Sequence, residues 1–363
     1  MENYRKLIGS ITIITFSYAA SRVLGFFREI LLANWAGVSE ATDTLDLAFI
    51  IPDFLFYLSA GGYLAITLIP IMSGKGEGEL NNYFLSILYG LSIIFVLFSL
   101  LTYSFRFQFA ELLDVKSLDF FTEVFTPIIF SQVFFFIGAI LMSYQYFHDN
   151  FKYAALAPVV YNSTIILFGW LNSSSPEETI KGFAIGTLVG SVLGHFLIQI
   201  YGAKKSGLNF YFISPKYKHL KEYITISLPL ILGQSIAVVD EQLFRVFGSF
   251  LTTGSIATFR YARRIALLPV GIIAQAVGVA SYPLLSRLFQ KNEIDELVKL
   301  VKKQLSYLFL IGSSLMVIAI INSEYLIGII YERGAFTNED TIRVSTVFTI
   351  ISLAIIPWSI NQI

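Results

Sequence analysis

Residues 8–35 read IGSITIITFSYAASRVLGFFREILLANW, an almost uninterrupted apolar run. A helix needs about 20 such residues to cross about 30 Å of hydrocarbon, so this run is long enough to span a membrane. It is also longer than the apolar region of a cleaved signal peptide, and it contains Arg22, Arg28 and Glu29. We therefore expect residues 8–35 to form a transmembrane helix that the mature protein retains.

The whole chain has the composition of a membrane protein. Apolar side chains make up 55% of its 363 residues and charged side chains 14%, against about 25% charged residues in soluble domains. The apolar runs are about 20 residues long, whereas the strands of a membrane barrel alternate over about 10 residues. The sequence therefore predicts an all-α integral membrane protein, a polytopic helical bundle.

Charge and cysteine content exclude several function classes. The 25 Lys and Arg residues balance the 25 Asp and Glu residues, so no general basic field indicates a nucleic-acid partner. The chain has no cysteine, which excludes disulfides, thiolate metal sites and thiol nucleophiles. Partners must therefore be inferred from local groups of charges.

Ten apolar runs are candidates for membrane-spanning helices. They are residues 8–35, 45–73, 82–105, 120–147, 151–172, 180–203, 221–251, 254–287, 304–330 and 341–363. Most Lys and Arg residues between these spans fall in loops that are cytoplasmic if the N-terminus is cytoplasmic. Because cytoplasmic loops retain basic residues, we expect the N-terminus to be cytoplasmic.

The chain divides into two lobes. The basic segment 204–220 separates residues 1–203, with six predicted spans, from residues 221–363, with four. Ala41-Thr42 and Ala257-Thr258 each follow the first helix of a lobe, which indicates a weak parallel repeat of the kind found in transporters. Six spans in the first lobe predict six in the second, so we expect the second lobe to be incomplete and the chain truncated.

The first predicted helix has one polar face. At 100° per residue, Ser21, Gly25, Arg28 and Glu29 fall within about 120° of Arg22, whereas the opposite arc is apolar. Ionisable residues at membrane depth are expensive and mark functional sites, and a guanidinium group suits bidentate binding of phosphate. The structural alternative is that the arginines reach the headgroup region or pair with Glu29.

A second group of arginines lies in the predicted span 254–287. Arg260, Arg263 and Arg264 recur at helical spacing and share one side of the helix. Acidic residues that could balance the arginines lie in two other spans, namely Asp43, Asp46 and Asp53, and Asp240 and Glu241 beside Arg245. These carboxylates could form permanent structural salt bridges with the arginines, or they could form salt bridges that hold a gate closed. Both interpretations stay open.

Other motifs argue against an enzyme. His148, His195 and His219 lie far apart without metal-ligand partners, and a lone membrane histidine such as His195 is most often a packing residue. Gly74–Gly78 lacks the context of a phosphate-binding loop, and no metalloprotease, nucleophile-elbow or dinucleotide motif is present. We expect no cofactor and no metal, and a transporter rather than an enzyme.

Several sequence blocks resemble a known family. Ser21–Glu29, SRVLGFFRE, followed by Ala41-Thr42-Asp43 is similar to the pattern S-R-x-L-G-x-x-R-[DE]…A-T-D of the MurJ (MviN)-type lipid II flippases. These belong to the multidrug/oligosaccharidyl-lipid/polysaccharide exporter superfamily. Further blocks resemble the family in the same order, namely 157–162, 261–271, 282–286 and 331–337.

The resemblance implies a V-shaped bundle of two lobes around a central cavity. Arginines matching Arg22, Arg28 and Arg264 would hold the pyrophosphate of an undecaprenyl-linked peptidoglycan precursor, lipid II, during its flip to the outer leaflet. We add Arg260, Arg263 and Ser21 as substrate-binding candidates, Glu29 and Asp43 as gate residues and Asp240 as a candidate ion site. Expected partners are the lipid-linked glycan precursor, membrane lipids and cell-wall synthesis proteins, with coupling to a monovalent cation or the membrane potential.

Two departures from the family pattern leave alternatives open. Residues 55–62 read LFYLSAGG where the family usually has L-R-R-x-x-x-E-G. The family also has fourteen spans, whereas ten are predicted in this chain. The alternatives are an exporter of another polyprenyl-linked oligosaccharide and a cation-coupled drug exporter. A membrane-embedded transferase would need a catalytic histidine or an acidic metal motif at the end of a span, and we find neither.

Overall fold

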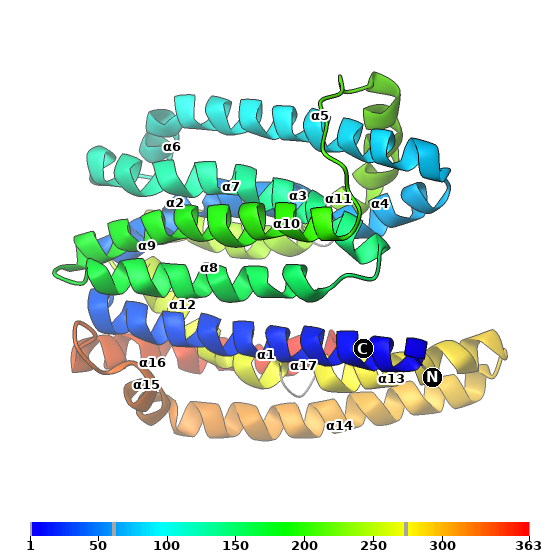
Figure 1. Ribbon diagram of the computed structural model, residues 1–363. Coiled ribbons are helices and arrows are strands. Elements are labelled where there is room, and N and C mark those ends of the chain that lie inside the picture. The colour runs from blue at the N-terminus through cyan, green and yellow to red at the C-terminus, as the bar shows by residue number, and fades with distance from the viewer. Residues whose placement is uncertain (1, 60–62, 272–274, 363) are drawn as a thin grey trace. The chain divides into compact units, whose positions relative to one another are not determined.

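The computed structural model describes residues 2–59, 63–271 and 275–362, and throughout these residues the regular secondary structure is helical. The chain forms two compact units, Met1–Thr253 and Gly254–Ile363 (Figure 1). The all-α prediction is confirmed by this helical content. Each unit is described in turn.

The first unit is built from long helices around α7. Its elements are α1 (Glu2–Ala36), α2 (Glu40–Ala48), α3 (Ile50–Ser59), α4 (Tyr63–Ser73), α5 (Glu77–Ser104), α6 (Arg106–Leu112), α7 (Leu118–Phe147), α8 (Lys152–Leu171), α9 (Pro176–Gly190), the π-helix η1 (Ser191–Leu197), α10 (Ile198–Lys205) and α11 (Tyr217–Ser249). Helix α7 packs against α4, α5 and α9. Helix α8 lies between α9 and α1, and α11 packs along α3 and α4 (Figure 1).

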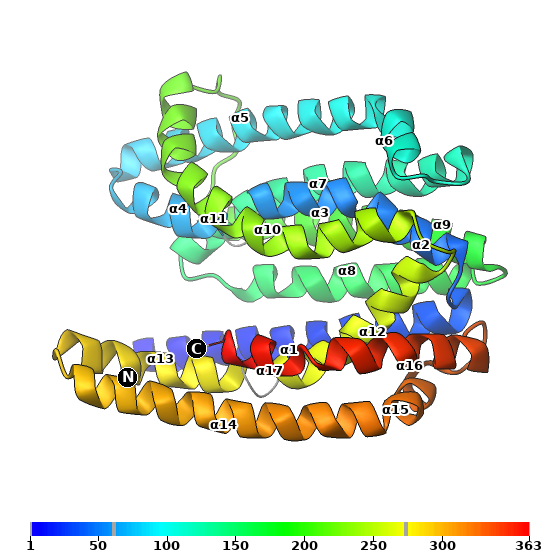
Figure 2. The ribbon, with the colours of Figure 1, turned by 180° about the vertical axis from the view of Figure 1, so that it is seen from behind.

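The second unit contains one long helix, α14, and several shorter ones. They are α12 (Ser255–Pro269), α13 (Gln275–Gln290), α14 (Ile294–Ile321), α15 (Ser323–Tyr331), α16 (Asn338–Ser352) and α17 (Ile355–Ile360) (Figure 2). Helix α16 packs against α12 and α15, and α17 packs against α14. Buried aromatic rings of Tyr261, Tyr331 and Phe336 meet at centroid distances of 5.0 to 5.6 Å and join α12 to the end of α15.

Each of the ten predicted spans coincides with a helix or with consecutive helices. Within the described residues, five helical segments are long and apolar enough to cross a membrane: Gly78–Ser104, Leu118–Phe147, Lys152–Leu171, Pro176–Lys205 and Ile294–Ile321. The predicted span 45–73 is divided among α2, α3 and α4. Pro52 contributes to the division between α2 and α3 because it has no amide hydrogen for the preceding turn.

Outward-facing apolar side chains fit a membrane environment. On α5, Ile94, Leu97 and Leu101 are 44%, 61% and 55% exposed. The opposite side of α5 carries Phe84, Leu85 and Leu88, which are buried against α4 and α7 in the main core of the unit. A helix that is apolar on all sides is stable where hydrocarbon replaces water around it.

The turn after α1 and the turn before α12 share a local design. Gly37 has φ 60° and Gly254 has φ 82°, the left-handed conformation that glycine adopts at low cost. The hydroxyl of Thr42 donates to the carbonyl of Gly37 at 3.1 Å, and that of Thr258 donates to the carbonyl of Gly254 at 2.7 Å. These bonds involve the two Ala-Thr pairs that indicated a repeat, and the repeat itself stays a prediction.

The compact units divide the chain at a different place from the predicted lobes. Helix α11 packs with the first unit, so the boundary between units falls at Thr253. The predicted lobes 1–203 and 221–363 are defined by the basic segment 204–220 between them. They therefore stay a prediction.

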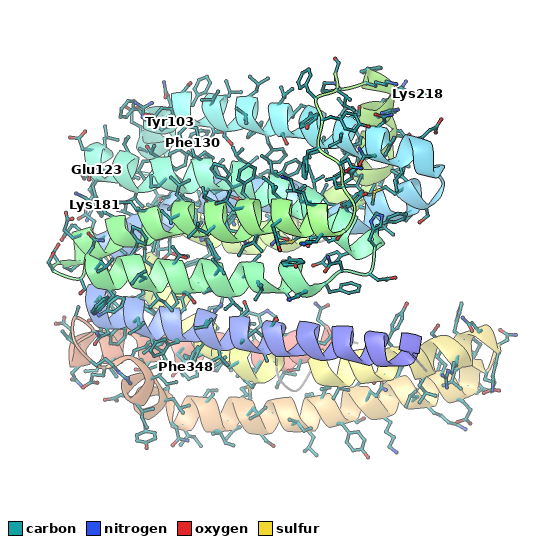
Figure 3. All side chains as sticks on the ribbon, viewed as in Figure 1. Tyr103, Glu123, Phe130, Lys181, Lys218 and Phe348 are labelled. Atoms are coloured by element: carbon teal, nitrogen blue, oxygen red, sulfur yellow. The ribbon has the colours of Figure 1, made fainter. Side chains whose placement is uncertain are left out.

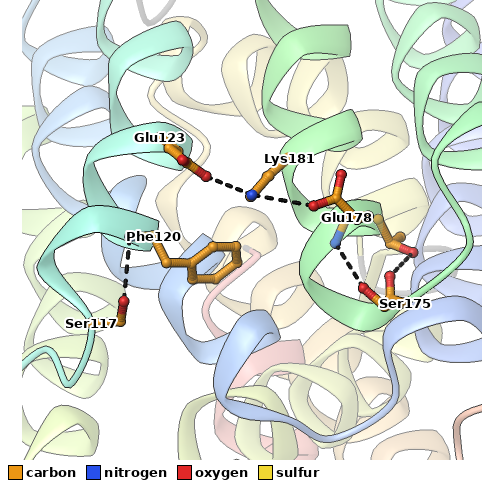
Figure 4. Close-up of polar contacts among 7 residues, drawn as sticks. Ser117, Phe120, Glu123, Ser175, Glu178 and Lys181 are labelled. Carbon is orange, nitrogen blue, oxygen red and sulfur yellow. Dashed lines mark hydrogen bonds and ion pairs between the residues drawn. The ribbon is translucent and has the colours of Figure 1, made fainter.

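A cluster of charges joins α7 to α9 at one end of the first unit (Figure 4). The Lys181 amino group lies 2.7 Å from Glu123 of α7 and 3.2 Å from Glu178 of its own helix. Helices α7 and α9 both begin at this end, where Ser117 and Ser175 accept hydrogen bonds from backbone amides of the first turn. These interactions fix the register of the two helices.

Candidate functional site

Arg28 is the best-defined member of the predicted polar face of α1. Its Nη1 donates to Oδ1 of Asn162 on α8 at 3.2 Å, and its Nη2 lies 3.2 Å from Oε1 of Glu29. Glu29 is buried, with 6% of its surface exposed. The face that the periodicity identified therefore turns its second arginine toward α8, and the predicted pairing with Glu29 is present.

Asn162 is a site residue that sequence reasoning missed. Its Nδ2 donates to the carbonyl of Pro158 at 2.9 Å, which leaves Oδ1 to accept from Arg28. The amide orientation is thereby set on both sides. The available signal was a polar residue four positions after a proline within a span, where such a side chain needs a partner.

The remaining polar residues of α1 have different surroundings. Ser21 is half-buried, whereas the side chain of Arg22 is exposed within its unit. Arg22 lies about one and a half turns before Arg28, so the two guanidinium groups are on the same helix but in different environments. The exposed position leaves Arg22 accessible to a ligand.

A cavity of about 390 Å³ reaches α1 at Ser17. It is lined by Ser17, Met142, Tyr146, Phe151, Ala154, Ala155, Pro158 and His195, from α1, α7, α8, η1 and the connection between α7 and α8. The ring of His195 packs 4.1 Å from Phe135 and 6.0 Å from Tyr161, measured between centroids. The histidine that the sequence suggested to be a packing residue is held among aromatic rings and also lines this cavity.

The π-helix that carries His195 is held by a buried glutamine pair. Gln145 of α7 donates through Nε2 to Oε1 of Gln199 at 2.9 Å. Gln199 in turn donates to the carbonyls of Tyr153 at 3.0 Å and Gly194 at 2.9 Å. A π-turn leaves irregular backbone acceptors, and the bond to Gly194 satisfies one of them, while the bond to Tyr153 connects Gln199 to α8.

Two of the predicted counter-charges meet in the first unit. Arg245 Nη1 of α11 lies 2.7 Å from Asp53 Oδ2 of α3, and Arg245 is buried, with 8% of its surface exposed. Gln242 Oε1 accepts a further bond from Arg245 at 3.5 Å. The pair connects α11 to α3. The candidate ion-site residue Asp240 belongs to α11, but its side chain lies outside the described residues.

The predicted gate residue Asp43 lies in the first turn of α2. It is buried, with 9% of its surface exposed, as is its neighbour Asp46 at 4%. Helix α2 begins with a capping box between Ser39 and Thr42. A carboxylate in the first turn is stabilised by the positive end of the helix dipole.

In the second unit the three arginines of α12 have separate environments. The Arg260 guanidinium lies 4.7 Å from the Tyr261 ring centroid, and that of Arg263 lies 5.9 Å from the Trp358 ring of α17. Arg264 is exposed within the unit. Arg264 is thus the arginine of this group most open to a ligand.

A metal ion needs several ligating side chains close together. Across the described part of the chain, no group of three or more His, Asp or Glu side chains is arranged to hold a metal ion. The polar groups brought together are guanidinium, carboxylate and amide groups on membrane helices. Such groups can bind an anion and exchange ion pairs during a conformational change.

Comparisons with known proteins identify the family to which this chain is similar. Residues 32–363 match the family described as lipid II flippase MurJ. A probable lipid II flippase MurJ of Buchnera aphidicola subsp. Baizongia pistaciae is 28% identical over 99% of this chain. The chain covers 72% of that protein, and it covers 53% of a probable lipid II flippase MurJ of Helicobacter pylori that is 26% identical.

Solved structures share the fold. A structure described as lipid II flippase MurJ in an inward closed conformation has a TM-score of 0.80 and 25% identity, and covers 97% of this chain. This chain covers 74% of it. An inward-facing multidrug resistance transporter of the MATE family has a TM-score of 0.63 at 13% identity, with coverage of 94% of this chain and 80% of its own.

Proposed function

Because this chain belongs to the MurJ lipid II flippase family, we propose that it binds lipid II and moves it from the inner to the outer leaflet by alternating access. The observation that carries the proposal is the match over residues 32–363, together with arginines on α1 and α12 at the positions of the family's blocks. Lipid II carries a pyrophosphate, and guanidinium groups bind phosphate oxygens in pairs.

Each candidate residue has a proposed role. Arg22, Arg28 and Arg264 hold the pyrophosphate, assisted by Arg260, Arg263 and Ser21. The side chains of Arg22 and Arg264 are exposed, which supports roles in which each contacts a ligand. Arg28 would exchange part of its contact with Glu29 or Asn162 for the ligand.

Glu29 and Asp43 act in closure rather than in substrate binding under this proposal. Their burial supports it, since a buried carboxylate facing pyrophosphate would repel the ligand. Asp240 is the proposed ion-site residue, with coupling to a monovalent cation or to the membrane potential. The N-terminus is placed in the cytoplasm and the chain in the bacterial inner membrane, near cell-wall synthesis proteins.

Photocrosslinking tests the pyrophosphate site. The purified chain is reconstituted in vesicles with photoreactive undecaprenyl pyrophosphate, and labelling is compared for Arg22→Ala and for Arg106→Ala, an arginine of α6 that has no proposed ligand role. One lost charged contact costs about 1.5–3 kcal/mol, so Arg22→Ala should reduce labelling about tenfold or more. Equal labelling of both variants, with normal folding, would assign Arg22 a structural role.

A competition experiment tests the substrate class. Unlabelled lipid II should displace the probe at lower concentration than undecaprenyl pyrophosphate without a glycan, because the head group adds contacts. A different polyprenyl-linked oligosaccharide that competes better than lipid II would indicate the alternative glycan substrate, consistent with the departure at residues 55–62. Displacement by a hydrophobic cation, and by neither lipid, would indicate a drug exporter.

A further inference from the structure

The connection between α10 and α11 is an ordered strap. Residues 208–216, called the strap below, have no regular secondary structure, yet they are fixed to the first turns of α5. Asn81 Nδ2 donates to the carbonyl of Asn209 at 2.9 Å, and the Asn209 amide donates back to Asn81 Oδ1 at 3.2 Å. This reciprocal pair holds the backbone of the strap as a neighbouring strand would.

Further bonds continue along the strap. The Tyr211 hydroxyl donates to Asn82 Oδ1 at 2.6 Å, and the Tyr89 hydroxyl donates to the carbonyl of Tyr211 at 3.1 Å. The Lys216 amide donates to Ser86 Oγ at 2.8 Å. The strap is therefore anchored at its beginning, middle and end, and its outward side chains start from a fixed backbone.

The inner side of the strap is apolar. Leu208 is buried, with 2% of its surface exposed, and Phe210 and Ile213 pack against the same core cluster of α4, α5 and α7. The outer side is different, since Phe212 is 87% exposed and Tyr217, the first residue of α11, is 77% exposed. Two large aromatic rings thus face outward next to a tightly packed backbone.

Lysines occupy the strap and the helix ends on both sides of it. Lys204, Lys205, Lys216, Lys218 and Lys221 are all exposed. Lys218 lies at the outer surface near the start of α11 (Figure 3). No Asp or Glu occurs between positions 204 and 221, and the next acid, Glu222, is bonded to Lys75 at 3.2 Å. Positions 204–221 therefore carry five lysines and no acidic residue.

The position of the strap decides what such a surface meets. It adjoins the start of the span Gly78–Ser104 and the end of the span Pro176–Lys205, so it lies where two membrane helices reach the same face of the bilayer. Aromatic rings are favoured at this interface, and lysines there meet lipid headgroups. A soluble acidic partner would explain the lysines but not the outward aromatic rings.

We propose that the strap and its flanking lysines form a docking surface for anionic phospholipid headgroups, with Phe212 and Tyr217 inserted at the level of the headgroups. Charge complementarity selects the lipid, and the anchored backbone of the strap lowers the ordering cost of binding. Each lysine near an anionic surface changes binding by about fivefold. This inference does not depend on the transported substrate.

Lipid selectivity measured beside the strap tests the proposal. The chain has no cysteine, so Ser214→Cys provides one site for a fluorophore on the exposed side of the strap. The labelled protein is reconstituted in phosphatidylcholine bilayers with a small fraction of spin-labelled phosphatidylglycerol or spin-labelled phosphatidylcholine. Quenching by the anionic lipid should exceed quenching by the zwitterionic lipid at least about threefold, and the excess should decrease with added salt.

Three variants make the test specific, two that each remove five positive charges and one that keeps the charges. Substitution of all five lysines by Gln should abolish the excess quenching, whereas substitution by Arg should retain it. The control replaces five exposed basic residues of the second unit by Gln, namely Arg287, Lys291, Lys299, Lys302 and Lys303. This control should retain the excess, because its net charge changes equally but at another place.

Aromatic insertion is tested with the same probe. Replacing Phe212 and Tyr217 by Ser should decrease quenching by both spin-labelled lipids, while the ratio between them persists. Equal quenching by the two lipids in the unsubstituted protein would overturn the proposal, as would an equal loss of selectivity in the five-lysine variant and in the control. Normal elution and circular dichroism identify variants that remain folded.

Discussion

The ion pair between Asp53 and Arg245 should contribute far more to stability than an exposed pair of the same length. Arg245 Nη1 lies 2.7 Å from Asp53 Oδ2, and the two side chains are 10% and 30% exposed. The Lys299 amino group lies 2.8 Å from Glu296 Oε1, but these side chains are 71% and 61% exposed. The two pairs therefore differ mainly in burial.

The expected magnitudes follow from that difference. Removing one partner of a fully buried pair costs about 3–5 kcal/mol because it leaves a buried charge. The Asp53 side chain is 30% exposed, so water can partly solvate its charge after the arginine is removed. We therefore expect Arg245→Met to reduce the free energy of unfolding by about 2–3 kcal/mol. Lys299→Met should change it by about 0.5 kcal/mol or less, since exposed pairs contribute little.

Equilibrium unfolding in mixed micelles measures both effects. Adding Asp53→Leu to Arg245→Met should recover part of the lost stability, with a coupling energy of about 1–3 kcal/mol, because no charge is then left unpaired by the substitution. Equal effects of the buried and exposed single substitutions would refute the reasoning. So would strict additivity of Asp53→Leu and Arg245→Met, which would show that the contact between α3 and α11 does not depend on this pair.

Three further outcomes test local features. Gly138→Ala should destabilise by about 2 kcal/mol or more in the same unfolding assay, since its Cβ would lie 2.0 Å from the carbonyl oxygen of His195, and Gly138→Ser should cost no less. Asn162→Leu should reduce the free energy of unfolding by about 1–2 kcal/mol in the otherwise unchanged protein, but by much less in a protein that already carries Arg28→Leu, because the lost hydrogen bond needs both partners. An equal reduction in both backgrounds would contradict this prediction. Burial, and after it the neighbouring lysines, lower the pKa of His219, so its contribution to stability should be complete above about pH 6.5 and lost as the pH falls below that value. His219→Phe should remove that part of the pH dependence, and an unchanged pH profile of unfolding would count against it.

Much of the candidate site could be predicted from residue spacing. The 100° rotation per residue correctly grouped Arg28 with Glu29 on one face of α1, because helical geometry is local. It could not identify Asn162 as the partner on α8, since spacing within one helix does not determine which neighbour that face meets. The same limit applies to Asp53 and Arg245, which were identified as counter-charges but not as a pair.

The sequence by itself determined the membrane class, the helical fold, the approximate spans and the family resemblance, because length and apolar composition decide whether a helix can cross a bilayer. Only the tertiary structure decided that α11 packs with the first unit, that Gln199 supports a π-turn beside His195 and that residues 208–216 bind along α5. These features depend on contacts between residues far apart in the chain. Such contacts form only when the helices are packed, since each requires a partner that local periodicity does not specify.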